Sequence, residues 1–264
     1  MENSSLSATS QKSPTPFPPN AFNPIVVVLT LLTLPVVIAV TGALVVLYAV
    51  AHGLTGTAGV QKWASSGLPS IQISAVGEIA AIAFLFAVLP EIAKMPLRDL
   101  GFRKLSGAEL LFALGGALVM VVVITGLASL LQWALHAKVS EQAVSVFLSL
   151  KTPGAKIEFA LIGIVLAPIA EETVFRVFIF NAARKYWGFW VGAIVSGLLF
   201  GAAHFQPGIS PAQTVILALP LALGGVVLCT VYARTGNAYA SMVTHGLFNA
   251  VTMSVLFFAP QLAK

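Results

Sequence analysis

The sequence predicts an all-α, polytopic integral membrane protein with about seven transmembrane helices, and eight as the alternative. Composition is the first observation: 58% of the 264 residues are hydrophobic and 9% are charged, whereas soluble domains carry about 25% charged residues. So few charges could not cover the surface of a soluble fold of this length. The second observation is a series of apolar segments that reach or approach the roughly 20 residues needed to cross a hydrocarbon core.

Seven apolar segments are the candidate spans, and they lie at residues 24–50, 70–90, 108–134, 158–181, 189–205, 212–233 and 238–258. Residues 139–150 are shorter and more mixed, so we expect them to lie along the interface or to fold back unless they form an eighth span. Residues 1–22 are rich in Ser, Thr and Pro, which predicts a disordered tail. The rest divides into N-terminal helices with a basic loop, 23–107, and a second membrane domain, 108–264.

The basic residues indicate topology rather than a nucleic acid partner. The formal net charge is +5, but no basic run exceeds two adjacent residues. Positive loop residues are retained on the cytoplasmic side of a membrane. The loops on the side of the N-terminus carry the larger share, which predicts a cytoplasmic N-terminus in a multi-pass protein of the cell (inner) membrane if the source is prokaryotic. The single cysteine, Cys229, excludes an internal disulfide and a cysteine metal cluster, and we expect it in the core.

Ionisable residues inside the spans are the strongest indication of function. A charge at membrane depth costs about 2.5–3.5 kcal/mol on insertion scales and by default marks a functional site. Span 158–181 contains Glu171, Glu172 and Arg176. Glu172 and Arg176 stand four residues apart on one helix face and can pair. Glu171 points about 100° away and is free to face a cavity.

Two further spans contribute imidazole and amide groups. Span 189–205 ends in His204, four residues after Phe200, and span 238–258 contains His245 and Asn249, again four residues apart. Each pair therefore projects from one helix face. His204 and Glu171 are nearly equidistant from the turn at Gly188, so they are expected at a similar depth on antiparallel neighbours. His245 reaches the same level if that turn extends beyond the membrane core.

Such a cluster is suited to hydrolysis. Glu171, helped by His204, could hold and deprotonate a water molecule as general base. His245 and Asn249 could donate hydrogen bonds to the oxyanion of a tetrahedral intermediate. A zinc site built from Glu171, His204 and His245 is the alternative, because two imidazoles and a carboxylate form a known zinc ligand set. The spacing itself does not require a metal, since a His-Glu-x-x-His string is absent.

The three strings together resemble the motifs of the CPBP family, the CAAX-protease and bacteriocin-processing membrane enzymes also called Abi proteins. They are Glu-Glu-x-x-x-Arg at 171–176, Phe-x-x-x-His at 200–204 and His-x-x-x-Asn at 245–249, and the likeness extends over roughly 90–258 from the Leu-Gly-Phe-Arg-Lys stretch near residue 100. The resemblance implies a helical membrane fold around a cavity reached from the cytosol, with 108–264 as the catalytic domain.

By the same resemblance, each motif residue takes a role in hydrolysis without a required cofactor. Glu171 and His204 would activate the water, His245 and Asn249 would stabilise the oxyanion, and Glu172 and Arg176 would support them. The substrate would be a peptide bond in a membrane-associated protein, of prenylated CAAX or bacteriocin type. Two other functions remain open at this stage: a non-catalytic peptide-binding or immunity protein that keeps the same cavity, and a proton-coupled transporter.

Overall fold

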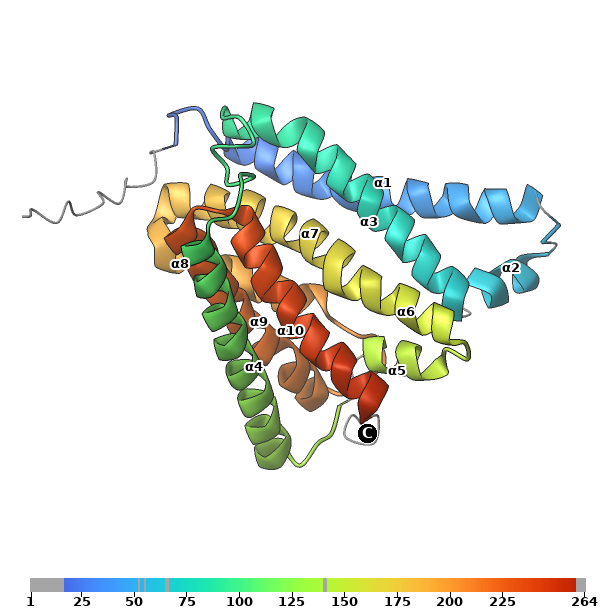
Figure 1. Cartoon of the computed structure of the whole chain (residues 1–264). Helices are drawn as coiled ribbons and strands as arrows, with labels where there is room; N and C mark the ends of the chain where they lie inside the picture. The colour runs from blue at the N-terminus through green and yellow to red at the C-terminus, as the bar shows by residue number, and fades with distance from the viewer. Residues whose placement is uncertain (1–16, 52, 55, 65–66, 140–141, 260–264) are drawn as a thin grey trace, which may run out of the picture.

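The structure is a computed structural model that describes residues 17–51, 53–54, 56–64, 67–139 and 142–259. Within these ranges the regular structure is entirely helical (Figure 1). The elements are α1 (Pro24–Ala51), α2 (Thr57–Ala64), α3 (Gly67–Ala93), α4 (Gly107–Leu135), α5 (Gln142–Ser149), α6 (Pro153–Leu161), the π-helix η1 (Ile162–Leu166), α7 (Ala167–Glu172), the π-helix η2 (Thr173–Phe180), α8 (Asn181–Ala203), α9 (Pro211–Thr235) and α10 (Ala238–Phe258). The predicted all-α membrane fold is confirmed.

Five of these helices are long and apolar enough to cross a membrane: α1, α3, α4, α9 and α10. They coincide with five of the seven predicted spans. The other two predicted spans are helical but differ in kind. Span 158–181 is divided among α6, η1, α7 and η2 and carries several charges, and span 189–205 is the part of α8 that follows a break at Gly188 (φ 77°). The short segment after α4 forms the eight-residue helix α5, which is too short to cross a bilayer.

The helices pack around the segment α6–η1–α7–η2. In Figure 1 this segment runs between α3 on one side and α10 on the other, and α1 lies alongside α3. Small residues let the backbones of α8 and α9 approach closely. A Cβ on Gly225 of α9 would lie 2.8 Å from Cα of Gly197 in α8, and one on Gly224 would lie 2.6 Å from Ile124 of α4. Gly224 and Gly225 therefore allow α9 to pack closely against α4 and α8.

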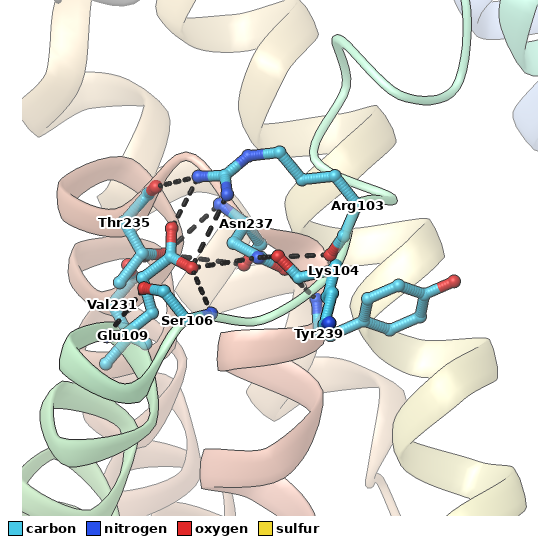
Figure 2. Close-up of polar contacts among 8 residues, drawn as sticks. All are labelled: Arg103, Lys104, Ser106, Glu109, Val231, Thr235, Asn237 and Tyr239. Atoms are coloured by element: carbon cyan, nitrogen blue, oxygen red, sulfur yellow. Dashed lines mark hydrogen bonds and ion pairs between the residues drawn. The ribbon is translucent and has the colours of Figure 1, made fainter.

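One end of the bundle is closed by the loop between α3 and α4, which packs on the α9–α10 turn. Figure 2 shows its polar contacts. Arg103 Nη2 donates to Glu109 Oε1 at 2.5 Å and to the carbonyl of Thr235, at the end of α9, at 2.9 Å. Asn237 Nδ2 donates to Glu109 Oε2 at 3.3 Å, and Ser106 caps α4 in a reciprocal capping box with Glu109. This arrangement fixes the start of α4 against the start of α10.

The predicted disordered tail is wrong for its last residues. Residues 1–16 lie outside the described part of the chain, but residues 17–22 are packed against α3 and α8. Phe22 is fully buried, and its N–H donates to the carbonyl of Ile92 at 2.7 Å. Lys185 Nζ donates to the backbone carbonyls of Pro19 and Ala21. Two aromatic residues in an otherwise polar segment supply enough apolar surface to order it.

Candidate active site

The helical segment that carries the two glutamates is interrupted by π-helix on both sides. α7 is only six residues long, with η1 before it and η2 after it. The wider π turn disturbs the usual i to i−4 hydrogen bonds, and such turns are frequent at functional sites. Side chains take up part of the freed capacity: Ser196 Oγ of α8 donates to the carbonyl of Phe175 at 2.7 Å, and Thr173 donates to that of Ile169 at 2.7 Å.

Glu172 lies at the centre of a buried charge cluster. Its side chain and that of Arg176 are both fully buried, and Arg176 Nη1 lies 3.0 Å from Glu172 Oε1. This is an ion pair by distance without the alignment of a hydrogen bond. His245 Nδ1 lies 3.0 Å from the same oxygen. The predicted i,i+4 pairing is therefore present, and it is extended across to α10.

Phe200 joins these charges to the two histidines. The Arg176 guanidinium lies 4.4 Å from the centre of the Phe200 ring, a cation–π distance. The ring packs edge-on against Phe175 at 5.2 Å and His245 at 5.6 Å, and lies 4.9 Å from the His204 ring. The buried Phe200 ring thus contacts three other motif residues, which are Arg176 of η2, His204 at the end of α8 and His245 of α10.

Glu171 faces away from this cluster into a cavity. Its side chain is 29% exposed, and Oε2 lies 3.8 Å from His245 Nε2, beyond hydrogen-bond distance. Among the described residues Oε2 has no hydrogen-bond donor. The cavity measures about 600 Å³ and is lined by residues of α3, α5, the α6–η2 segment and the end of α8. Glu171 therefore lines an open space with a partly exposed side chain, while its buried Oε2 lacks a hydrogen-bond donor.

His204 lines the same cavity and ends α8. Its Nδ1 lies 2.8 Å from the carbonyl of Phe200. A carbonyl only accepts, so we assign the proton to Nδ1, which leaves Nε2 of the neutral ring as an acceptor. His204 also borders a second, largely apolar cavity of about 590 Å³ between α8 and α9. Glu171 and His204 therefore line the same cavity, and their joint role stays a prediction.

Asn249 lies one turn from His245 on α10, and its amide is in use. Nδ2 donates to the carbonyl of Gly163 in η1 at 2.7 Å. An amide has two N–H groups, so one remains for another acceptor. His245 has a parallel constraint: Nδ1 donates to the Glu172 carboxylate, so only Nε2 is available on the Glu171 side.

All seven motif residues fall within 153–251, and this range matches the family described as Rce1-like, type II CAAX prenyl endopeptidase. We name residues 153–251 the Rce1-like segment, after the family that they match. The chain is also 34% identical over 95 residues to an "Uncharacterized 24.3 kDa protein" of Escherichia coli, covering 35% of this chain and 41% of that protein. It is 23% identical over 176 residues to the "Putative membrane peptidase YdiL" of Bacillus subtilis (strain 168), covering 67% and 68% of the two chains. No solved structure matches.

The family recognised from the three motifs is thus confirmed over the Rce1-like segment, which lies inside the predicted domain 108–264. The chain spans about two fifths of the length of the E. coli relative. Helices α1 and α3 precede the matched range, although α3 lines the cavity. The site is therefore built from the Rce1-like segment plus at least one helix outside it.

The alternative zinc site on Glu171, His204 and His245 is not assembled in the structure. Across the described residues, no three His, Cys, Asp or Glu side chains are grouped closely enough to hold a metal ion. His204 directs Nδ1 to its own helix, and His245 directs Nδ1 to Glu172. Cys229 is fully buried, as predicted for a core residue.

The position of the cavity bears on two predictions, the cytoplasmic N-terminus and the access to the cavity from the cytosol. Its lining comes from the start of α3, from α5 and from the end of α8, at the end of the bundle opposite the α3–α4 loop (Figure 1). That loop and the start of α1 share the more basic end. The predicted cytoplasmic N-terminus and the predicted access from the cytosol thus concern different ends of the bundle, and both stay predictions.

The sequence reasoning missed one residue of the cavity, Glu78 of α3. It lines the cavity with Glu171 and His204, and Oε2 is buried without a hydrogen-bond partner in the described structure. The signal was available: Glu78 is the lone ionisable residue of the predicted span 70–90, and the rule that singled out Glu171 applies equally to it.

Proposed function

We propose that this protein is a membrane-embedded endopeptidase that hydrolyses a peptide bond in a membrane-associated protein, with Glu171 as general base. The observation that supports it most is the shared cavity. Glu171, with a side chain that is 29% exposed, and His204, whose Nε2 is left as an acceptor, both line one cavity of about 600 Å³. A water molecule between them could be held by both and deprotonated by the carboxylate.

The proton path follows from these positions. Glu171 takes a proton from the water as its oxygen bonds to the scissile carbonyl carbon. When the carbon–nitrogen bond breaks, Glu171 returns that proton to the leaving nitrogen. The carbonyl oxygen becomes negatively charged in between, and preorganised donors stabilise that charge. The free N–H of Asn249 is the donor that we assign, and an imidazolium form of His245 would add a second one at Nε2, because Nδ1 already donates to Glu172.

Glu172 and Arg176 have a supporting role in this scheme. Glu172 accepts from His245 Nδ1 and fixes the orientation of that ring, as carboxylates commonly do for functional histidines. Arg176 balances the negative charge of Glu172 in a site without water contact. The apolar cavity next to His204 has room for the hydrophobic part of a membrane peptide. These features suit an apolar peptide substrate better than a soluble one.

The decisive test compares cleavage by the wild-type protein and Glu171→Gln in the same membranes. Mass spectrometry of membrane peptides should show products with the wild type that are reduced about 10²–10⁴-fold with Glu171→Gln. His204→Ala should act in the same direction. Glu91→Gln is the matched control, because Glu91 lies on α3 with an 82% exposed side chain far from the cavity. Equal products from wild type and Glu171→Gln, with equal folding, would refute the proposal.

A chelator added to the same cleavage assay tests whether the activity depends on a metal ion. The proposal expects purified active protein to keep its activity in a chelator. Loss of activity on chelation and recovery on addition of zinc would instead assign Glu171, His204 and His245 as metal ligands that come together during turnover. Binding of a peptide that survives Glu171→Gln, with no cleavage by either protein, would favour the non-catalytic binding function.

A further inference from the structure

The cavity wall holds a second carboxyl that the hydrolytic scheme leaves unused. Glu78 extends from α3, outside the Rce1-like segment, and lines the cavity with Glu171. Glu78 Oε2 has less than 1 Å² of accessible surface and no donor in the described residues. A buried carboxyl oxygen without a hydrogen-bond donor lowers the stability of the folded protein. A ligand that enters the cavity and pairs with this carboxyl would offset that loss.

The charge of the lining indicates what that partner is. The described residues that line the cavity include two carboxyls and one histidine but no lysine and no arginine. Arg176, the cation closest in sequence to Glu171, is fully buried behind Glu172 and Phe200. The cavity therefore attracts a positive group and repels a negative one, and its low-dielectric walls strengthen both effects.

We propose that Glu78 is a specificity-determining residue that binds a lysine or arginine side chain of the peptide, close to the bond that Glu171 hydrolyses. The proposal rests on the endopeptidase function above. An ammonium or guanidinium group in the cavity would pair with the Glu78 carboxylate in its wall, and charge-assisted bonds of this kind are the strong ones. A free terminal carboxylate would instead meet two carboxyls, so cleavage within a chain is favoured over cleavage beside a charged C-terminus.

Matched peptides test this preference directly. The probes are apolar membrane peptides, identical except for Lys, Gln or Glu at one position near the centre, with amidated or free C-termini. Binding to purified full-length protein in nanodiscs is measured by fluorescence anisotropy, and cleavage is measured by mass spectrometry. The wild type should favour the Lys peptide over the Gln peptide by about 10-fold or more, and should discriminate against the Glu peptide. It should also favour amidated over free C-termini.

Variants at and beside Glu78 locate the effect. Glu78→Gln should remove the preference and retain cleavage of the Gln peptide. Ser74→Lys places a cation one turn away on the same helix and in the same cavity lining, so it should remove the preference without changing Glu78. Glu91→Gln, on the exposed end of α3, should keep it. Thermal unfolding of each variant shows whether it is folded.

The outcomes separate this proposal from the endopeptidase function. An unchanged Lys preference in folded Glu78→Gln and Ser74→Lys overturns the role of Glu78, as does the absence of any preference in the wild type. If cleavage depends on Glu171 but not on peptide charge, the proposed function stands and this inference falls. If Lys-selective binding depends on Glu78 and no peptide is cleaved, the binding role stands and the proposed function falls.

Discussion

Two polar clusters join helices in this protein, and they use their hydrogen-bonding capacity differently. In the cluster around Glu109, shown in Figure 2, the carboxylate accepts from Arg103, Ser106 and Asn237, and each donor has a defined partner. In the cluster around Glu172, one oxygen takes both contacts, and Oε2 has no partner among the described residues.

The difference separates a structural connection from a candidate reactive site. A satisfied network fixes one geometry and has little left to offer a ligand. Unused acceptors beside a cavity cost stability in the free protein and are useful when a substrate or water supplies the missing donor. We therefore assign the Glu109 cluster to holding α4, α9 and α10 together. We assign Glu171 to the reaction, Glu172 to positioning His245, and Glu78 to binding of the substrate.

The largest expected effect on stability comes from breaking the buried pair. Arg176→Met leaves the Glu172 carboxylate without its counter-charge and should lower the free energy of unfolding by about 3–5 kcal/mol. The double variant Glu172→Leu/Arg176→Met removes both charges and should recover about half of that loss. Thermal and denaturant unfolding in detergent measure both. A double variant as unstable as the single one would show that Glu172 contributes little beyond its pairing with Arg176.

A smaller effect is expected in the satisfied cluster. Glu109→Ala leaves the donors of Arg103, Ser106 and Asn237 with one acceptor fewer and should cost about 1–3 kcal/mol of unfolding free energy. Turnover per folded molecule should stay within about twofold of the wild type, because Glu109 lies at the end of the bundle away from the cavity. Unfolding and peptide cleavage are measured on the same preparation. A large loss of turnover in folded Glu109→Ala would contradict the separation of the two clusters.

The sequence predicts those features that depend on local spacing or hydropathy. Five spans were recoverable because hydrocarbon thickness fixes helix length. The pairing of Glu172 with Arg176 follows from their four-residue separation. The shared cavity of Glu171 and His204 follows from their equal distances from the turn at Gly188.

The missed features depend on contacts between distant segments. The hydrogen bond from His245 to Glu172 and the one from Asn249 to Gly163 join residues 73 and 86 positions apart. Their geometry is set by the π-helical turns of η1 and η2, which hydropathy does not reveal, since it records composition and not the hydrogen-bond register. Phe22 was assigned to a disordered tail because its docking surface on α3 and α8 lies far along the chain.

The smallest predicted effects come from two capping boxes with the same chemistry at opposite ends of the bundle. Ser106 caps α4 with Glu109, and Ser210 caps α9 with Gln213. Replacing either serine with alanine removes the side-chain acceptor for the helix N–H and should cost about 1 kcal/mol of unfolding free energy.

Ser210→Ala and Ser106→Ala remove the same kind of cap, so any difference in their turnover comes from where the two serines lie. Ser210 lies four residues after Gln206, the last residue of the His204–Gln206 segment that lines the cavity. A loosened start of α9 should therefore change the position of His204. Small displacements of reacting groups reduce turnover strongly. Ser210→Ala should therefore lower turnover per folded molecule in the peptide cleavage assay, and Ser106→Ala should not. Equal turnover in both would mean that the cavity does not depend on how α9 begins, and would leave the Phe200 carbonyl as the contact that positions His204.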